Sequence, residues 1–236
     1  RFSQDFTYNG DDLGANWSAS KTEFKLWAPT AETVKIALYH TGTAGTDDLI
    51  DIVKMIRSEY GVWHGEKIGD INGVYYTYLI KVNGNEDEVV DPYARTTGVN
   101  GNRGMVLDLQ STNPDGWDAD CNPNPLKSYT DAVLYELHVR DFSIEPSSGI
   151  TEAYRGKFLG LTEHGTKTPS GTPTGLDYLK SLGITHLHLL PIYDYGSVDE
   201  TQPEKGYNWG YDPVNYNIPE GSYSSNPYRG EVRIRE

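Results

Sequence analysis

The sequence predicts two parts of different fold class, a β-sandwich in residues 1–110 and a parallel α/β unit in residues 131–236. In the first part, apolar and polar residues alternate over short runs that end in turns, which is the period of a half-buried antiparallel strand. In the second part, two nearly continuous apolar runs enclose one helical segment, as in parallel strands joined by a crossover helix. Residues 111–130 are rich in Pro, Asn and Asp and predict a linker.

Three runs in the first part show the alternation clearly. They are "FKLWA" (24–28), "VKIALY" (34–39) and "VYYTYLIKV" (74–82), and "MVLDL" (105–109) adds a shorter strand. Asn72-Gly73 and Asn83-Gly84 predict hairpin turns on either side of the third run. Several short strands with frequent turns are typical of a sandwich of about 100 residues.

Two tryptophans in this part, Trp27 and Trp63, have two interpretations. Large aromatic side chains in a small sandwich most often fill the core, and this is the interpretation that we favour for both. The alternative is that an exposed indole stacks on a sugar ring.

The second part predicts one βαβ unit. Residues 132–139 and 184–191 are apolar enough to form strands that are buried on both faces. Between them, residues 174–183 predict a helix that is capped by Thr174, ends at Gly183 and has an apolar stripe. The stripe is formed by Leu176, Leu179 and Leu182. A right-handed crossover would make the two strands parallel neighbours.

The composition excludes several kinds of partner. The 236 residues carry 20 basic and 34 acidic side chains, so the formal net charge is −14. A field of this sign repels phosphate backbones and anionic lipids, and we therefore expect no nucleic acid or membrane partner. The single Cys121 excludes an internal disulfide but does not decide between a bacterial cytoplasmic and a secreted location.

The stretch "YNWGYDPVNYNIPEGSY" (207–223) is too rich in Asn, Gly and Pro for a regular element, yet it carries four tyrosines and a tryptophan. It follows the second predicted strand, and ligands of parallel α/β folds bind on the loops after the carboxyl ends of strands. Aromatic rings there can lie against the apolar face of a sugar while Asn and Asp bind its hydroxyl groups. The alternative is that the rings only pack the loop onto the sheet.

Four other side chains invite a functional interpretation. His186 and His188 share one face of a strand and could bind a metal ion, but core imidazoles explain the pattern better. Asp141 and Asp194 follow the two strands and could act as general acid and base. Carboxylates at strand ends are more often structural hydrogen-bond acceptors, and this is the favoured interpretation.

Five segments resemble those of the type I pullulanases, starch-debranching enzymes of the α-amylase superfamily of glycoside hydrolases. "YNWGYDP" (207–213) is similar to that group's signature and is the most specific of the five. The others are "FKLWAPTA" (24–31), "VVDPYARTTGVNG" (89–101), "AVLYELHVRDFS" (132–143) and "GITHLHLLPIYDY" (183–195). The resemblance covers nearly the whole chain.

The resemblance implies an immunoglobulin-like β-sandwich followed by the first strands of a (β/α)8 barrel. It implies hydrolysis of α-1,6-glucosidic links in pullulan and branched α-glucans with retention of configuration. Tyr211 would stack on the glucose ring next to the cleaved bond, and Asn208, Trp209 and Asp212 would shape that subsite. The catalytic carboxylates would lie outside this chain, no cofactor is needed for the chemistry, and a structural calcium ion is compatible with the family.

An eight-stranded barrel needs about 250 residues, and two strands cannot close one. We therefore expect residues 131–236 to pair with the remaining part of a barrel, as a second chain or as sequence outside these residues. Two alternatives stay open at this point. One is a branching enzyme or isoamylase of the same superfamily, and the other is a non-catalytic α-glucan-binding module.

Overall fold

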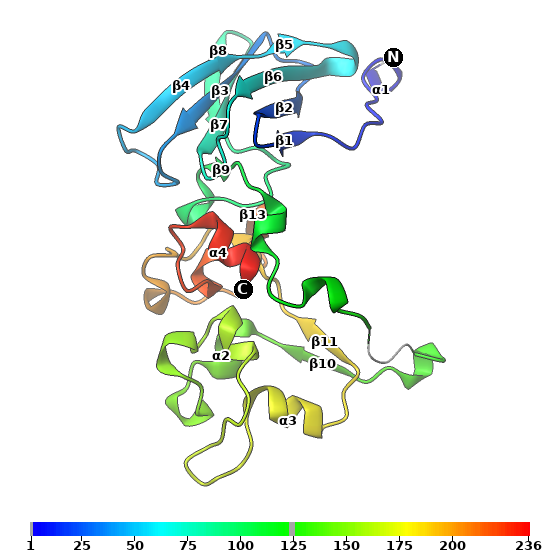
Figure 1. The fold of residues 1–236 in the computed structure, drawn as a ribbon, viewed down its shortest axis with the longest axis vertical. Coiled ribbons are helices and arrows are strands. Elements are labelled where there is room, and N and C mark those ends of the chain that lie inside the picture. The colour runs from blue at the N-terminus through cyan, green and yellow to red at the C-terminus, as the bar shows by residue number, and fades with distance from the viewer. Residues whose placement is uncertain (1, 123–125) are drawn as a thin grey trace.

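The structure is a computed structural model that describes residues 2–122 and 126–236. Figure 1 shows two sheets at one end of the molecule and a smaller parallel pair of strands towards the other. Part of the predicted linker, residues 123–125, lies outside the described residues. None of the helices in the described ranges is long and apolar enough to cross a membrane.

The first part is a sandwich of two antiparallel sheets that follows a short helix α1 (Phe2–Asp5). One sheet has the strand order β1-β2-β6-β5, and the other has the order β4-β3-β7-β8 with β9 paired to β7. The strands are β1 (Gly14–Trp17), β2 (Lys21–Trp27), β3 (Thr33–Tyr39), β4 (Leu49–Lys54), β5 (Ile56–Arg57), β6 (Val62–Ile68), β7 (Tyr75–Val82), β8 (Asn85–Val89) and β9 (Gly104–Met105).

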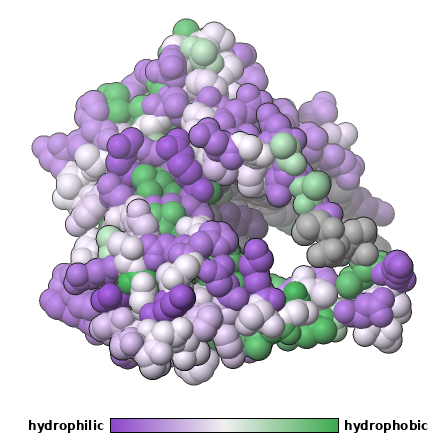
Figure 2. Space-filling view, turned by 60° about the horizontal axis from the view of Figure 1, so that its bottom comes forward, coloured by the Kyte–Doolittle hydropathy of each residue, from purple (hydrophilic) through white to green (hydrophobic). Residues whose placement is uncertain are grey.

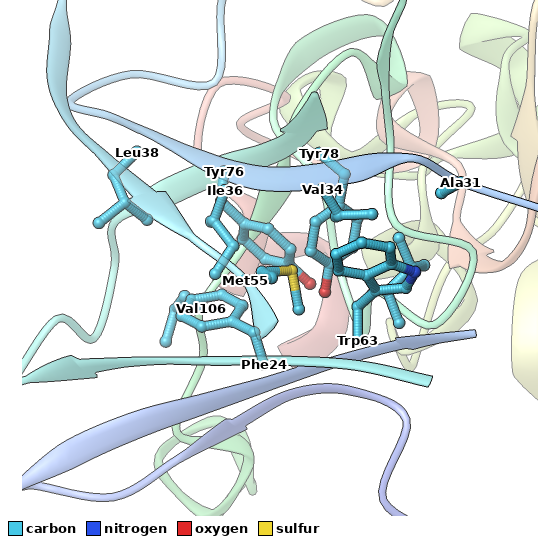
Figure 3. Packing of buried hydrophobic residues seen from close by; sticks show 11 residues of the cluster. Phe24, Ala31, Val34, Ile36, Leu38, Met55, Trp63, Tyr76, Tyr78 and Val106 are labelled. Atoms are coloured by element: carbon cyan, nitrogen blue, oxygen red, sulfur yellow. The ribbon is translucent and has the colours of Figure 1, made fainter. Parts of the chain in front are cut away.

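The core of the sandwich forms where the alternating residues of both sheets meet, as the period of two predicts. Phe24 on β2, Ile36 on β3 and Tyr76 on β7 are all fully buried there (Figure 3). The rings of Phe24 and Tyr76 meet edge to face with centroids 5.2 Å apart. The hydroxyl group of Tyr76 donates to Asp91 at 2.7 Å, so the buried phenol has the polar partner that it needs.

The two tryptophans differ in their surroundings. Trp63 is buried in the core, as predicted, and its indole N–H donates to the Ala28 carbonyl at 2.9 Å. The core prediction is wrong for Trp27, whose side chain is 41% exposed. Because Phe24 and Leu26 point inward, the alternation along β2 turns Trp27 to the outer face.

Of the two predicted hairpin turns, one is confirmed. Asn83 and Gly84 both adopt positive φ, at 50° and 80°, and join β7 to its antiparallel neighbour β8. Asn72-Gly73 also forms a turn, but it connects β6 in one sheet to β7 in the other. The prediction of a hairpin there is wrong because the dipeptide specifies the local turn and not the partner of the strand that follows.

The sheet that contains β3 and β7 has buried apolar residues on its outer face as well as on the face that meets the other sheet. Ala37, Tyr39, Tyr75 and Met105 form a second buried cluster on the far side of the β3–β7 sheet. The chain near the C-terminus covers this cluster, because the Tyr75 hydroxyl group donates to the Tyr228 carbonyl at 3.0 Å. The strand predicted at 105–109 is shorter in the structure. It is β9, which ends at Met105, and a 3-10 helix begins at Leu109.

The second part contains the predicted parallel pair. Its elements are β10 (Leu134–Leu137), α2 (Val139–Ser143), α3 (Gly175–Ser181), β11 (His186–Leu189), β12 (Tyr193–Tyr195), β13 (Pro213–Pro219) and α4 (Gly230–Arg235). β10 and β11 pair in parallel, with Leu134 opposite His186 and Leu137 opposite Leu189. β12 and β13 form a separate antiparallel ribbon.

The prediction that both strands are buried on two faces is wrong for this chain. Leu134 is 66% exposed and Leu187 is 41% exposed. Figure 2 shows hydrophobic residues at the surface along this lower part of the molecule. The reason is that β10 and β11 form a sheet of only two strands within the described residues, so no neighbour covers them.

Helix α3 agrees with the prediction in most respects. It follows Thr174 and ends before Gly183, which has a φ of +70°. Leu179 is buried and Leu176 is half-buried, but Leu182 lies 44% exposed at the C-cap. The Thr174 side chain donates to the Ser148 carbonyl at 2.5 Å and does not bond to the helix N-terminus.

A buried ion pair joins the two parts of the chain. Arg233 on α4 is fully buried and donates to both carboxylate oxygens of Glu200, at 3.1 and 2.8 Å. The same guanidinium donates to the Gly98 carbonyl in the sandwich at 3.3 Å. The backbone N–H of Asn100 donates to Glu200 at 2.7 Å, and Asn100 Oδ1 accepts from the Glu200 N–H at 2.8 Å.

Two more carboxylates lie in this junction, and burial disfavours their charged forms. Desolvation raises the pKa of Asp194 from 3.8 to about 8, and the nearby Glu200 charge adds to the shift. Desolvation, again with the charge of Glu200, raises the pKa of Glu220 to about 7. Two carboxylates thus lie beside one guanidinium, because Asp194 Oδ1 is 3.6 Å from Arg233 Nη1 and Glu200 is bonded to the same group.

Replacing Ile36 with alanine should lower the free energy of unfolding of the sandwich by about 2–5 kcal/mol, because it removes a fully buried side chain and leaves a cavity. Ile68→Ala is the matched control, because Ile68 is 69% exposed. Urea unfolding followed by tryptophan fluorescence measures both. Equal effects of the two substitutions would contradict the assignment of the core.

The junction should make stability fall as the pH rises from about 4 to 8. Native Asp194 keeps its proton up to about pH 8, whereas in the unfolded chain the group loses it near its ordinary value of 3.8. The native state therefore binds more protons across this window, so unfolding becomes easier at higher pH. Between pH 6 and 8 the loss should be about 2 kcal/mol in urea unfolding.

Asp194→Asn is the matched variant, because the amide keeps the shape of the side chain and cannot titrate. It should reduce this pH dependence, and the part that remains is expected from Glu220, whose pKa is also raised. A slope that is the same in the variant and the unaltered protein would show that Asp194 is not its source.

Candidate functional site

A cavity of about 450 Å³ lies at the carboxyl end of β11. Its walls come from the last residues of β11, the ribbon of β12 and β13, and the aromatic loop before β13. The lining residues are His188, Leu189, Leu190, Pro191, Tyr193, Gly210, Tyr211, Pro213 and Tyr216. The loop after the second strand therefore does border a hollow, as the order of elements predicts.

Gly210 explains how the loop reaches the end of β11. Its φ is +88°, which favours glycine, and a Cβ atom there would lie 2.6 Å from the Pro191 carbonyl oxygen. Any other residue would push the loop away from the strand. The close approach places Tyr211 beside Pro191 on the wall of the cavity, with its side chain 71% exposed.

Asn208 and Asp212 hold the loop around Gly210. Asn208 Oδ1 accepts from the Gly210 N–H at 2.7 Å, and Asn208 Nδ2 donates to Asp212 at 2.6 Å. The hydroxyl group of Ser197 donates to the other Asp212 oxygen, and this bond lowers the pKa of Asp212. Asn208 and Asp212 therefore fix the shape of the loop through hydrogen bonds within the protein.

Trp209 lies in an aromatic cluster behind the loop, whose centre is His138. The His138 ring stacks on Tyr207 with centroids 5.4 Å apart and meets the edge of Trp209 at 6.1 Å. The Asn208 carbonyl lies 2.8 Å from His138 Nε2, and the Tyr223 hydroxyl lies 3.2 Å from the same atom. His138 therefore anchors the loop that carries Tyr211.

Sequence reasoning missed the role of His138. It is a buried imidazole at the end of a predicted strand, and the polar "RDFS" segment begins two residues later. A titratable ring at the end of a predicted strand, in a chain with a loop rich in aromatic residues, is the feature of the sequence that could have indicated this role.

The two aspartates after the strands are not brought together as an acid and base. Asp141 accepts from the Tyr207 hydroxyl at 2.8 Å and from Arg140 at 3.1 Å. Asp194 is buried in the junction, where Asn215 donates to it at 2.5 Å. Both carboxylates have structural partners, which agrees with the interpretation that the sequence favoured.

The two histidines on β11 are exposed, so the core interpretation is wrong for them. His186 Nδ1 lies 2.8 Å from the Thr185 hydroxyl, and His188 Nδ1 lies 3.3 Å from a Glu136 oxygen. They are exposed for the same reason as Leu187, because the described chain has no third strand beside them. His188 lines the cavity with Tyr211.

One group of possible metal ligands occurs among the described residues, formed by Asp194, Glu200 and Glu220 with carboxylate oxygens within 4.8 Å of one another. Oxygen ligands of this kind suit Ca²⁺. Arg233 already provides a positive charge among them through its bonds to Glu200. A structural calcium ion therefore stays a prediction that this geometry does not require.

The arrangement of the cavity suits a neutral, flat-sided ligand. Tyr193, Tyr211 and Tyr216 line it and are each about half or more exposed, at 47%, 71% and 67%. Exposed phenol rings provide an apolar face together with a hydroxyl group that can bind polar atoms of a ligand. Leu189, Leu190 and Pro191 form an apolar floor.

Comparisons with known proteins agree with the resemblance noted in the sequence. Residues 12–94 match Carbohydrate-binding module 48 (Isoamylase N-terminal domain). The chain is 41% identical over 235 residues to the pullulanase of Bacillus subtilis (strain 168), which covers all of this chain and 31% of that protein. It therefore spans about a third of the length of this relative.

Solved structures give the same result. A pullulanase from Paenibacillus barengoltzii, in complex with maltohexaose and α-cyclodextrin, superposes with a TM-score of 0.94 at 52% identity. It covers 99% of this chain and 36% of that one. A pullulanase from Anoxybacillus sp. LM18-11, complexed with maltotriose, superposes at 0.92 with 44% identity, covering 99% of this chain and 32% of that one.

The chain thus contains a carbohydrate-binding module 48, an immunoglobulin-like β-sandwich, at residues 12–94, and is homologous along its whole length to the pullulanases.

Proposed function

We propose that this chain is part of a pullulanase that hydrolyses α-1,6-glucosidic links in pullulan and branched α-glucans. The observation that carries the proposal is the cavity beside Tyr211, in a chain that aligns over its whole length with pullulanases. The bond is cleaved with retention of configuration, through a covalent glycosyl-enzyme. The chain supplies the sandwich and one wall of the subsite, and the catalytic carboxylates lie outside it.

The parallel unit is the beginning of a (β/α)8 barrel in this proposal. β10, α3 and β11 supply the first two strands and the crossover helix between them, and the domain boundaries are 1–110, 111–130 and 131–236. The exposure of Leu134 and Leu187 supports this, because apolar residues of parallel strands are normally covered by neighbouring elements. The remaining part of the barrel is therefore a partner of this chain.

Tyr211 binds the glucose ring next to the cleaved bond. Its ring is exposed on the cavity wall, and the bonds of Asn208 and Asp212 fix the loop that carries it. A platform that is fixed before the ligand arrives loses less entropy on binding. Asn208 and Asp212 shape the subsite from within the loop, and Trp209 does so through its contact with His138.

Replacing Tyr211 with alanine in the complete enzyme should lower kcat/KM for pullulan about 10- to 100-fold, because the stacking platform is lost. Tyr211→Phe is the matched control, since it keeps the ring and should retain most of the activity. Thermal unfolding should be the same for both variants, because Tyr211 is 71% exposed. Unchanged turnover in Tyr211→Ala would refute the stacking role.

Product analysis decides between the proposed activity and its relatives. The complete enzyme should release maltotriose from pullulan, as detected by chromatography of the digest. Glucan with new branches would identify a branching enzyme, and an enzyme that debranches glycogen but leaves pullulan intact would identify an isoamylase. The 236-residue chain alone should release no sugar, since the catalytic carboxylates are absent from it. Binding without any hydrolysis by the complete protein would favour a non-catalytic module.

A further inference from the structure

A second cavity, of about 110 Å³, shares no lining residue with the cavity at Tyr211. Its walls come from α2 and the segment after it, from the chain between β12 and β13, and from the 3-10 turn after β13. The lining residues are Arg140, Ile144, Arg155, Gly156, Lys157, Tyr195, Val198, Pro203, Glu204, Gly206, Asn208, Ser222 and Tyr223.

Positive charge is in excess around this smaller cavity. Arg140, Arg155 and Lys157 line it, and of the described residues in its walls only Glu204 is acidic. The chain as a whole carries a net charge of −14, so this balance is the reverse of that of the complete sequence. A hollow with excess positive charge attracts an anion.

A tight turn at Gly156 brings two of the three cations to the same cavity. Gly156 lies between Arg155 and Lys157 and has a φ of +71°. Its N–H donates to Ser143 Oγ at 2.8 Å, and a Cβ atom there would lie 3.1 Å from Ile144 Cδ1. Glycine therefore allows the chain to pack closely against the end of α2 while the side chains before and after it line one space.

Both cations keep hydrogen-bond donors that the protein does not use. Arg155 Nε donates to the Ile150 carbonyl at 2.9 Å, and its two terminal nitrogens make no hydrogen bond to the residues that the structure describes. Lys157 Nζ donates to the Ser224 carbonyl at 2.8 Å and more weakly to the Ser222 carbonyl at 3.4 Å. An ammonium group has three N–H donors, so at least one stays available to a ligand.

Lys157 also lacks a charged partner within the described ranges. Burial lowers the pKa of its ammonium group, and the charge of Glu236 opposes this shift. The Glu236 carboxylate is itself bonded to the N–H and hydroxyl groups of Ser225. A half-buried cation whose partners are neutral carbonyls gains from an anion that enters beside it.

The size and the other walls of the cavity restrict the kind of anion. The volume equals that of about four waters in the liquid, which is too small for a glucose unit. Ile144, Val198 and Pro203 add apolar walls to the cationic ones. The planar fork of an arginine matches the two oxygens of a carboxylate. A small molecule with a carboxylate and a short hydrocarbon part fits both features.

We propose that this cavity is a binding site for a short-chain monocarboxylate. The carboxylate binds Arg155 and Lys157, and the hydrocarbon part packs against Ile144 and Val198. Asn208 lines the same cavity and holds the loop of Tyr211 through its bonds to Gly210 and Asp212. The bound anion therefore supports this loop from behind and lowers KM for pullulan with kcat unchanged. The effect on KM rests on the proposed function, whereas the binding itself does not.

Isothermal titration calorimetry of the complete enzyme with sodium butyrate, against sodium chloride of equal ionic strength, measures the site. The expected Kd is on the order of 1 mM. Lys157→Gln should raise it about 10- to 100-fold, because the amide can still donate to the Ser224 carbonyl but carries no charge. Lys205→Gln is the matched control, since it removes the same charge from an exposed residue outside the cavity and should leave the Kd unchanged.

Two further probes test the class of ligand. 1-Butanol has the hydrocarbon part without the charge, and inorganic phosphate has the charge without the hydrocarbon part. Both should bind at least about tenfold more weakly than butyrate. Binding of either probe as tight as that of butyrate would overturn the assignment to a monocarboxylate. The absence of any heat of binding with butyrate up to about 50 mM would overturn the site itself.

Kinetics with pullulan separate the remaining outcomes. An unchanged KM at saturating butyrate would overturn the link between the anion and the loop of Tyr211. The failure of the proposed function looks different, because the unaltered enzyme would then leave pullulan intact while butyrate still binds in the calorimeter.

Discussion

The burial of the Arg233 guanidinium is the constraint that relates the two parts of the chain. It binds Glu200 with two hydrogen bonds and reaches the Gly98 carbonyl of the sandwich. An unpaired buried charge costs several kcal/mol, so these partners must keep their positions. Arg233 also donates to the Pro219 carbonyl at the end of β13, at 3.2 Å. The sandwich is thereby connected to the ribbon that borders the cavity, and the loop with Tyr211 enters β13 from the other end.

Much of the fold could be predicted from the period of its apolar residues. Phe24 and Ile36 are buried as the alternation requires, and the two apolar runs do pair in parallel. The errors arise where a neighbour far away in sequence decides the outcome. The pattern of β11 could not show that Leu187 lacks a cover, and Trp27 was assigned to the core although the alternation of its own strand turns it outward. At the candidate site, the resemblance pointed to Tyr211, which lines the cavity, but nothing in the sequence pointed to His138, whose role depends on contacts with a loop about 70 residues away.

The chain presents aromatic rings in two different ways that share one physical principle. Tyr211 is positioned by the approach of Gly210 to Pro191, and Trp27 is positioned by hydrogen bonds from its indole N–H. In each case a backbone contact or a hydrogen bond within the protein fixes the position of the ring, and the ring stays partly exposed to solvent.

A structure of the complete protein with maltotriose would show whether Tyr211 holds a sugar. We expect a glucose ring parallel to the Tyr211 ring, at about 4 Å. We also expect a further strand to pair with β10 or β11, so that Leu134 and Leu187 are covered. Sugar bound elsewhere, with Tyr211 free in solvent and the two strands still uncovered, would contradict this account.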